Sequence, residues 1–478
     1  MKFLKKYIGT RAFYRALLVL VIPIIIQQGI TNFVSLLDNV MVGKLGTYPM
    51  SAVSIVNQLI FVFNLAIFGG LSGASIFGTQ FYGVSDWKGM RDTFRFKMMF
   101  SLVTAVLAMV IFSLWGDGLV MMFLRSEQNT AAEIQVTLEE ARAYLAVAVW
   151  GLIPFAIVQA YAGTLRETGE TVIPMTGGVM AIVVNLVFNY LLIYGKFGFP
   201  AWGVKGAAVA TVLSRFVELA YVAVATHRRH EKFRFIEGAY RSAHVPGELV
   251  RKITVFGTPL LLNEVLWSLG MTAINQNYSV RGIVVVAAMN ITTTAWNLFC
   301  VIMFAMGSAI SILIGQKLGA QDREGAIDTK DKLLFLSLVL HILIGLLLIA
   351  AAPLIPKLYK VEPEVQTLAT QFLRVAGASL PIHALIHSIY FVIRSGGKTC
   401  VTFLFDSVYT ICVPALLSLI LYRHTSLGIL MIYFIVQFSD VIKLAIGIPM
   451  VRSGFWANCL IGGITGNEQT KQKTADGD

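Results

Sequence analysis

The sequence predicts an all-α integral membrane protein with twelve transmembrane helices in two pseudo-symmetric six-helix lobes. Three observations predict this fold class. Only 13% of the residues are charged and 56% are hydrophobic, whereas ordinary globular domains carry about 25% charged residues. Apolar segments recur along the whole chain, and each is long enough to cross a hydrocarbon layer about 30 Å thick. The second half of the chain also repeats the first.

The predicted spans must be helices. A segment inside a bilayer has to satisfy its own backbone hydrogen bonds, and these apolar runs lack the period-2 alternation of a membrane β-barrel. Charged residues and Gly or Pro breaks set the approximate limits of each span. We expect the spans at residues 16–40, 51–82, 96–124, 138–162, 171–194, 204–226, 252–277, 283–316, 333–357, 366–393, 400–422 and 426–450.

The positive charges indicate the orientation of the chain. A net charge of +12 could point to nucleic acid, but the basic residues lie in short segments between apolar runs and form no single patch. The bias of Lys and Arg toward cytoplasmic segments explains them. We therefore expect no nucleic-acid partner, a multi-pass protein of the plasma membrane in contact with membrane lipid, and both termini in the cytoplasm.

The longest basic connection lies near the middle of the chain. It carries Arg228, Arg229, Lys232, Arg234, Arg241, Arg251 and Lys252. This position predicts an N-lobe at residues 1–226, a cytoplasmic linker at 227–251, a C-lobe at 252–451 and a polar C-terminal tail at 452–478.

An internal duplication supports the two lobes. Shifting the sequence by 236 residues aligns 23–103 with 259–339 without a gap. The identities include Pro23/Pro259, Asn39/Asn275, Gln80/Gln316 and Gly83/Gly319. A weaker match at 228 residues pairs Arg166-x-x-Gly169-x-Thr171 with Arg394-x-x-Gly397-x-Thr399. Parallel repeats of six spans are typical of transporters with a substrate site between the halves, although duplication alone can simply enlarge a bundle.

Polar residues form a stripe on the first helix of each lobe. In the first lobe they include Gln27, Gln28, Asn32, Ser35 and Asp38, and in the second Asn263, Glu264 and Ser268. Spacings of three to four residues place each set on one helix face. A lipid-facing stripe would be costly, so these faces should line a watery interior. For the uncharged members, hydrogen bonding between packed helices explains the pattern equally well. Candidate cavity residues are Gln28, Asn32, Ser35, Asn57, Ser268 and His387.

Two carboxylates stand out within these stripes. Neither Asp38 nor Glu264 has a basic residue within one helical turn. A buried carboxylate without a counter-charge takes up a proton or binds a cation. Glu264 aligns with Gln28, and Asp38 lies ten residues further along its helix, roughly 15 Å at the helical rise. We therefore expect two separate coupling sites.

The other charges within the spans have a structural interpretation. Arg215 with Glu218, and Asp440 with Lys443, are opposite charges three residues apart and can neutralise each other locally. Asp406 has no nearby partner and stays a weak candidate. His383 and His387 share a helix face, but no Cys or carboxylate lies close in sequence, so packed or proton-sensitive histidines are favoured over a zinc site.

No motif indicates an enzyme or a bound cofactor. Gly397-Lys398-Thr399 ends like a phosphate-binding loop, but Val392 stands where the first Gly is required and no strand precedes it. No nucleophile and base, metal cluster or cofactor motif occurs at usable spacing. The sequence therefore predicts transport that an ion gradient drives.

The motifs together resemble the multidrug and toxic compound extrusion (MATE) family. They are Asp38-Asn39-Val40-Met41-Val42-Gly43-x-Leu45-Gly46, Arg166-x-x-Gly169-x-Thr171, Asn185-Leu186-x-x-Asn189-Tyr190 and Gly203-x-x-Gly206-Ala207-Ala208-x-Ala210-Thr211. The resemblance implies export of amphipathic, cationic small molecules by Na⁺ or H⁺ antiport with alternating access. It also implies a cation site, for Na⁺ if that is the ion, at Asp38, Asn185 and Asn189, with Thr211 contributing and Glu264 as the C-lobe acid.

The resemblance carries two further expectations. We expect a monomer with a small-molecule substrate. The alternative function is that of a flippase for a lipid-linked precursor or polysaccharide, which has a related architecture. Such a flippase would need a strongly basic cavity for a pyrophosphate, whereas the stripes here carry acids.

Overall fold

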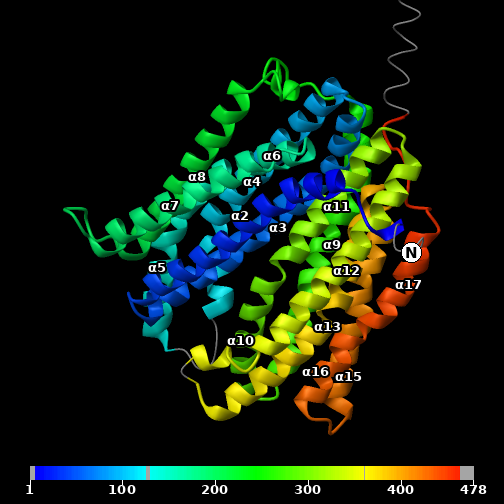
Figure 1. Cartoon of the computed structure of the whole chain (residues 1–478). Coiled ribbons are helices and arrows are strands. Elements are labelled where there is room, and N and C mark those ends of the chain that lie inside the picture. The colour runs from blue at the N-terminus through cyan, green and yellow to red at the C-terminus, as the bar shows by residue number, and fades with distance from the viewer. Residues whose placement is uncertain (1–5, 125–129, 360, 463–478) are drawn as a thin grey trace, which may run out of the picture. The chain divides into compact units, whose positions relative to one another are not determined.

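The computed structural model describes residues 6–124, 130–359 and 361–462, without the side chains of residues 34–36, 39 and 40. Within these ranges the chain forms long helices joined by short turns (Figure 1). Twelve of the described helical segments are long and apolar enough to cross a membrane. The predicted all-helical membrane fold with twelve spans is confirmed.

The helices of the first half follow the predicted spans closely. They are α2 (Arg11–Gly43), α3 (Thr47–Gly83), α4 (Trp87–Leu124), α5 (Ala131–Ala148), α6 (Leu152–Glu167), α7 (Val172–Tyr194) and α8 (Gly203–Arg228). A 3₁₀ turn, Val149–Gly151, joins α5 to α6 within one span. Thr130 and Glu133 form a reciprocal capping box at the start of α5. Gly195 ends α7 in the left-handed conformation, at φ 64°.

The helices of the second half are interrupted more often. They are α9 (Gly247–Ser279), α10 (Ile283–Phe299), α11 (Val301–Gly319), α12 (Arg323–Ala351), α13 (Pro363–Ser395), α14 (Thr399–Phe403), α15 (Leu416–His424), α16 (Ile429–Phe438) and α17 (Asp440–Arg452). The predicted span 283–316 is wrong as a single helix, because the chain breaks at Cys300. Two π-helical turns, η4 (Leu404–Val408) and η5 (Ile411–Ala415), separate α14 from α15. Pro414 lies inside η5 and lacks the N–H that regular helical bonding needs.

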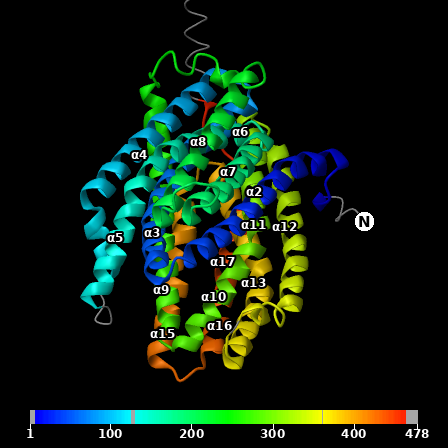
Figure 2. The ribbon, with the colours of Figure 1, turned by 90° about the vertical axis from the view of Figure 1, so that its left-hand side faces the viewer.

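The chain packs into two compact units. One contains residues 26–78 and 87–250, and we call it the N-unit; the other contains residues 1–25, 79–86 and 251–478, and we call it the C-unit. In the N-unit, α7 and α8 lie side by side in both views (Figures 1 and 2). In the C-unit, α12 packs along α13. Both α2 and α3 contribute residues to each unit.

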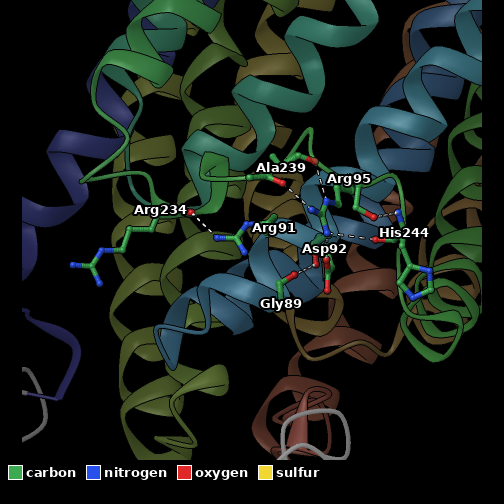
Figure 3. A network of polar contacts seen from close by, with 10 residues as sticks. Gly89, Arg91, Asp92, Arg95, Arg234, Ala239 and His244 are labelled. Atoms are coloured by element: carbon green, nitrogen blue, oxygen red, sulfur yellow. Dashed lines mark hydrogen bonds and ion pairs between the residues drawn. The ribbon is translucent and has the colours of Figure 1, made fainter.

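The basic connection after α8 is anchored on α4. The Arg95 guanidinium donates to the backbone carbonyls of Gly238 (2.8 Å) and Ala239 (2.9 Å), and it pairs with Asp92 at 2.9 Å. Figure 3 shows Arg95 pointing from α4 toward Ala239 and His244. The connection also buries the rings of Phe233 and Phe235 completely. It is therefore a structured part of the N-unit.

The described residues after α17 are also packed. Trp456 is fully buried in the C-unit, and its indole N–H donates to the Val451 carbonyl at 2.9 Å. The Gln80 side chain, near the end of α3, accepts from the Leu460 N–H (2.7 Å) and donates to the Asn458 carbonyl (3.3 Å). Residues 454–461 thus form a strap that covers the Gln80 side chain.

Candidate functional site

A polar face on α7 forms one wall of the candidate cation site in the N-unit. Asn185 and Asn189 are four residues apart, so their side chains lie one above the other on the same helix face. They are 6% and 2% exposed, respectively, on a helix that is mostly apolar. Buried amides need hydrogen-bond partners, and these come from α2 and α8.

Asp38 of α2 meets this face. The Asn189 amide nitrogen donates to Asp38 Oδ1 at 2.7 Å. Asp38 itself is half-buried. The Tyr194 hydroxyl donates to the Met41 carbonyl at 2.8 Å and so fixes the end of α2 against α7. The sequence-predicted set of Asp38, Asn185 and Asn189 is therefore brought together in one place.

The Asn185 amide lies between Asp38 and Thr211 of α8. Its nitrogen donates to both Asp38 oxygens, at 3.0 and 3.1 Å, and its oxygen accepts from Thr211 Oγ1 at 3.2 Å. Thr211 thus lies beside Asn185, and the family resemblance implies a contribution from this residue.

Tyr144 of α5 is a member of this site that sequence reasoning missed. Its ring is buried, and its hydroxyl hydrogen-bonds to Thr211. Nothing in the spacing of α5 distinguishes this tyrosine from the other apolar residues of its span, so only the fold reveals it.

No ammonium or guanidinium group of the described residues contacts the Asp38 carboxylate. Within the described ranges, Asp38 forms no ion pair. Arg215 acts on Asp38 only at longer range, and it is held by Glu218 of its own helix at 2.9 Å. The predicted pairing of Arg215 with Glu218 is confirmed. Asn189 Oδ1 is also buried and receives no hydrogen bond. This arrangement leaves carboxylate, amide and hydroxyl oxygens available to a small cation or a proton.

Glu264 lies in the other unit, on α9. It is half-buried, and in the described part of the chain it has neither a hydrogen bond nor an ion pair. The charged residues that interact with it electrostatically, at longer range, are Arg394 and Asp406. Asp38 thus belongs to the N-unit and Glu264 to the C-unit, and within the described residues neither has a directly bound counter-charge.

Three expectations about charges in the C-unit are wrong. Lys443 does not pair with Asp440, because its ammonium group lies 2.7 Å from Asp406 Oδ1. Asp406 therefore has a basic partner. Asp440 instead lies 3.4 Å from His383 Nε2, so His383 has a carboxylate close by after all. Side chains from separate helices approach each other here, which spacing along one helix cannot show.

The weaker cavity candidates have mixed surroundings. Gln28 and Ser268 are half-buried, whereas Asn32 and Asn57 are exposed. His387 packs edge-on against Phe304 and Phe391, with ring centroids 5.4 and 4.9 Å away, as a packed histidine should. The side chain of Ser35 lies outside the described residues. No group of three or more His, Cys, Asp or Glu side chains within the described ranges is arranged to hold a metal ion.

The N-unit also contains a buried ion pair that the sequence did not predict. Lys97 of α4 forms an ion pair with Glu167 of α6, and its ammonium donates to Thr164 Oγ1 at 3.2 Å. Both charged side chains are almost completely buried. They lie near the ends of predicted spans, so neither looked unusual in the sequence.

Comparison with known proteins identifies the family. The MatE family model matches residues 23–191 and 259–418, which covers both repeats. The chain is 24% identical over 420 residues to the "Probable multidrug resistance protein NorM" of Thermotoga maritima, and the match covers 87% of each protein.

Solved structures agree on the fold. One is an outward-facing multidrug resistance MATE family transporter of the MOP superfamily, with a TM-score of 0.81 and 19% identity over 92% of this chain and 96% of that chain. Another is a mutant of the Vibrio cholerae MATE transporter VcmN, with a TM-score of 0.82 and 18% identity over 93% and 98% of the two chains. The family match, spanning both halves of a duplicated twelve-span helical fold, shows that the chain belongs to the MatE family of membrane transporters.

Proposed function

We propose that this chain is a secondary active transporter that exports amphipathic, cationic small molecules in exchange for Na⁺ or H⁺. Alternating access between the two sides of the membrane is the proposed mechanism. Membership of a family of cation-coupled transporters supports the class of mechanism. The name of the Thermotoga maritima relative, a probable multidrug resistance protein, supports the class of substrate.

The Asp38 site is the observation on which the coupling proposal rests. A carboxylate within a membrane-spanning bundle is costly unless it is paired, and intramembrane carboxylates commonly serve ion or proton pathways. Asp38 has amide donors but no ion pair within the described ranges. Binding a proton or a Na⁺ ion would neutralise its charge, and losing that cation would restore it.

The Asn185 amide supports this role of Asp38. Its nitrogen donates to both carboxylate oxygens. A proton or a cation bound at Asp38 would compete with these donors, so its binding would change the contact between α2 and α7. Differential stabilisation of two protein states by the ion is what coupling requires.

The composition supports an adaptable substrate site. The chain contains 17 Met and 31 Phe residues. Thioether and aromatic side chains give polarisable contacts that tolerate varied ligands. The proposed direction is export, by a plasma-membrane protein with both termini in the cytoplasm. The exposed basic side chains of the connection after α8 support that orientation. A monomer is the proposed assembly.

Efflux from proteoliposomes tests the proposal. Purified protein would be reconstituted with ethidium inside the vesicles, and ethidium loss would be followed under a Na⁺ gradient and, separately, under a pH gradient. We expect one gradient to drive efflux in the wild type. Asp38→Asn should abolish the gradient-driven component, because the neutral amide no longer exchanges charge with the ion.

Two controls make the result specific. Asp117→Asn changes an exposed carboxylate that pairs with Arg142 at 2.6 Å, and it should transport like the wild type. Glu264→Gln tests the second candidate acid by the same assay. If Asp38→Asn and Glu264→Gln both follow each gradient like the wild type, the proposed coupling sites are wrong.

A further inference from the structure

The Asp406 carboxylate in the C-unit is paired with a cationic side chain of the same protein, Lys443. Asp406 lies in the π-helical turn η4, and Lys443 reaches it from α17. Lys443 Nζ is 2.7 Å from Asp406 Oδ1, and the lysine side chain is only 6% exposed. The two groups therefore form a close, charge-assisted hydrogen bond in a largely dry environment.

The second carboxylate oxygen is also occupied. The Asn263 amide nitrogen donates to Asp406 Oδ2 at 3.0 Å. Ser407 holds Asn263 in place, since its hydroxyl lies 2.7 Å from Asn263 Oδ1 and 2.6 Å from the Asn263 carbonyl. Both oxygens of Asp406 thus have donors whose positions are fixed by neighbouring groups.

Aromatic rings also lie close to the ammonium group. Lys443 Nζ lies 5.2 Å from the centre of the Phe405 ring and 5.5 Å from that of the Tyr409 ring. Ring faces attract a desolvated cation. Lys443 is therefore held by one carboxylate and two rings, which compensates the loss of water around its charge.

The internal duplication shows that the two halves differ at this point. At the 228-residue spacing Asp406 aligns with Gly178. A Cβ atom built on Gly178 would lie 3.1 Å from Gln27 Nε2, and Gln27 aligns with Asn263 at the 236-residue spacing. The equivalence thus holds in space, and the first half has no acid where the second half has Asp406.

The reverse difference applies to the Asp38 site. Its members Asp38, Asn185 and Asn189 align with Ile274, Val413 and Leu417. Each half therefore has its own hydrogen-bonded carboxylate site at a different place. Within the described residues, only the one in the second half contains an ammonium group.

We propose that Lys443 is the permanent counter-cation of Asp406, so that Asp406 takes up no coupling ion and Asp38 does. This inference rests on the proposed function. Removing the ammonium group while keeping the carboxylate should create an additional cation site. Removing both charges should leave the number of cations exchanged per substrate molecule unchanged.

The number of cations exchanged per ethidium tests this inference. It is obtained from the ion gradient at which net ethidium flux through reconstituted protein stops. We expect Lys443→Gln to exchange one more cation per ethidium than the wild type. The double variant Lys443→Gln/Asp406→Asn should return to the wild-type number. Adding Asp38→Asn to either background should remove gradient-driven efflux.

Matched controls separate a change in the number of cations exchanged from a loss of folding. Arg142→Gln removes the basic partner of the exposed carboxylate Asp117, and it should leave the number unchanged. Thermal melting in detergent identifies any variant that does not fold. The inference is overturned if Lys443→Gln folds and exchanges the wild-type number of cations. It is also overturned if the folded double variant loses coupled efflux. A wild type that moves no ethidium under any gradient would instead refute the proposed function.

Discussion

Gly83 and Gly319, which occupy equivalent positions of the two repeats, each face the backbone of the other's helix. A Cβ atom on Gly83 would lie 2.1 Å from the Gln316 carbonyl oxygen, and one on Gly319 would lie 2.0 Å from the Gln80 carbonyl oxygen. Gln80 and Gln316 are themselves repeat partners. The ends of α3 and α11 therefore cross in a nearly two-fold manner within the C-unit, at a separation that only glycine permits.

This crossing predicts that one added methyl group greatly lowers the stability of the folded protein. Gly319→Ala should destabilise the protein by about 1–3 kcal/mol, because its Cβ meets backbone that cannot rotate away. Gly163→Ala, on α6, adds the same group where nothing lies within 4 Å and should be neutral or stabilising by up to about 1 kcal/mol. Melting temperatures in detergent compare the two. Equal effects would contradict the close contact.

The buried Lys97–Glu167 pair gives a second prediction. Lys97→Met should cost about 3–5 kcal/mol, because it leaves the Glu167 carboxylate buried without its counter-charge. The double variant Lys97→Met/Glu167→Gln should recover much of that loss, since neither charge remains. Thermal unfolding of the single and double variants forms the test. A double variant as unstable as the two losses combined would show that the residues act independently.

Tyr144 should tune the affinity of the Asp38 site. Tyr144→Phe removes only the hydroxyl that bonds to Thr211, and one neutral hydrogen bond is worth about 0.5–1.5 kcal/mol. We expect the concentration of coupling ion needed for half-maximal efflux to rise by up to about tenfold. Tyr190→Phe, which removes a hydroxyl from an exposed ring on α7, serves as the control. Unchanged ion dependence in Tyr144→Phe would remove Tyr144 from the site.

Asp322 predicts a pH-dependent contribution to stability. It caps α12, and the hydrogen bond from Lys317 (2.7 Å), followed by that from the Gly325 N–H (2.8 Å), lowers its pKa below the usual range. Because the folded-state pKa lies below the unfolded one, the stabilisation is present above the unfolded pKa of about 3.9. It is lost as the pH falls through the folded pKa.

The matching experiment compares the wild type with Asp322→Ala. At pH 7 the variant should be less stable by about 1 kcal/mol, the typical worth of a helix cap. The difference in melting temperature should shrink as the pH is lowered below 4. A difference that stays constant over this range would mean that ionisation of Asp322 contributes nothing.

The fold and part of the candidate site were predictable from local pattern. Long apolar runs fix the spans, and the polar stripe on the first helix singles out Asp38. Asn185 and Asn189 were expected only from the family resemblance. The break at Cys300 was not predictable, since no Gly or Pro marks it. The partners of Lys443 and Lys97 come from other helices, and their identity depends on packing that spacing along one helix does not encode.

The strap over Gln80 has a consequence for how the protein is made. Gln80 lies in the second of the long helices, whereas Asn458 and Leu460 leave the ribosome almost four hundred residues later. The Gln80 side chain therefore lacks these two hydrogen-bond partners during most of translation. Insertion of the early helices can proceed, but the end of α3 forms its last hydrogen bonds only after Leu460 has been synthesised.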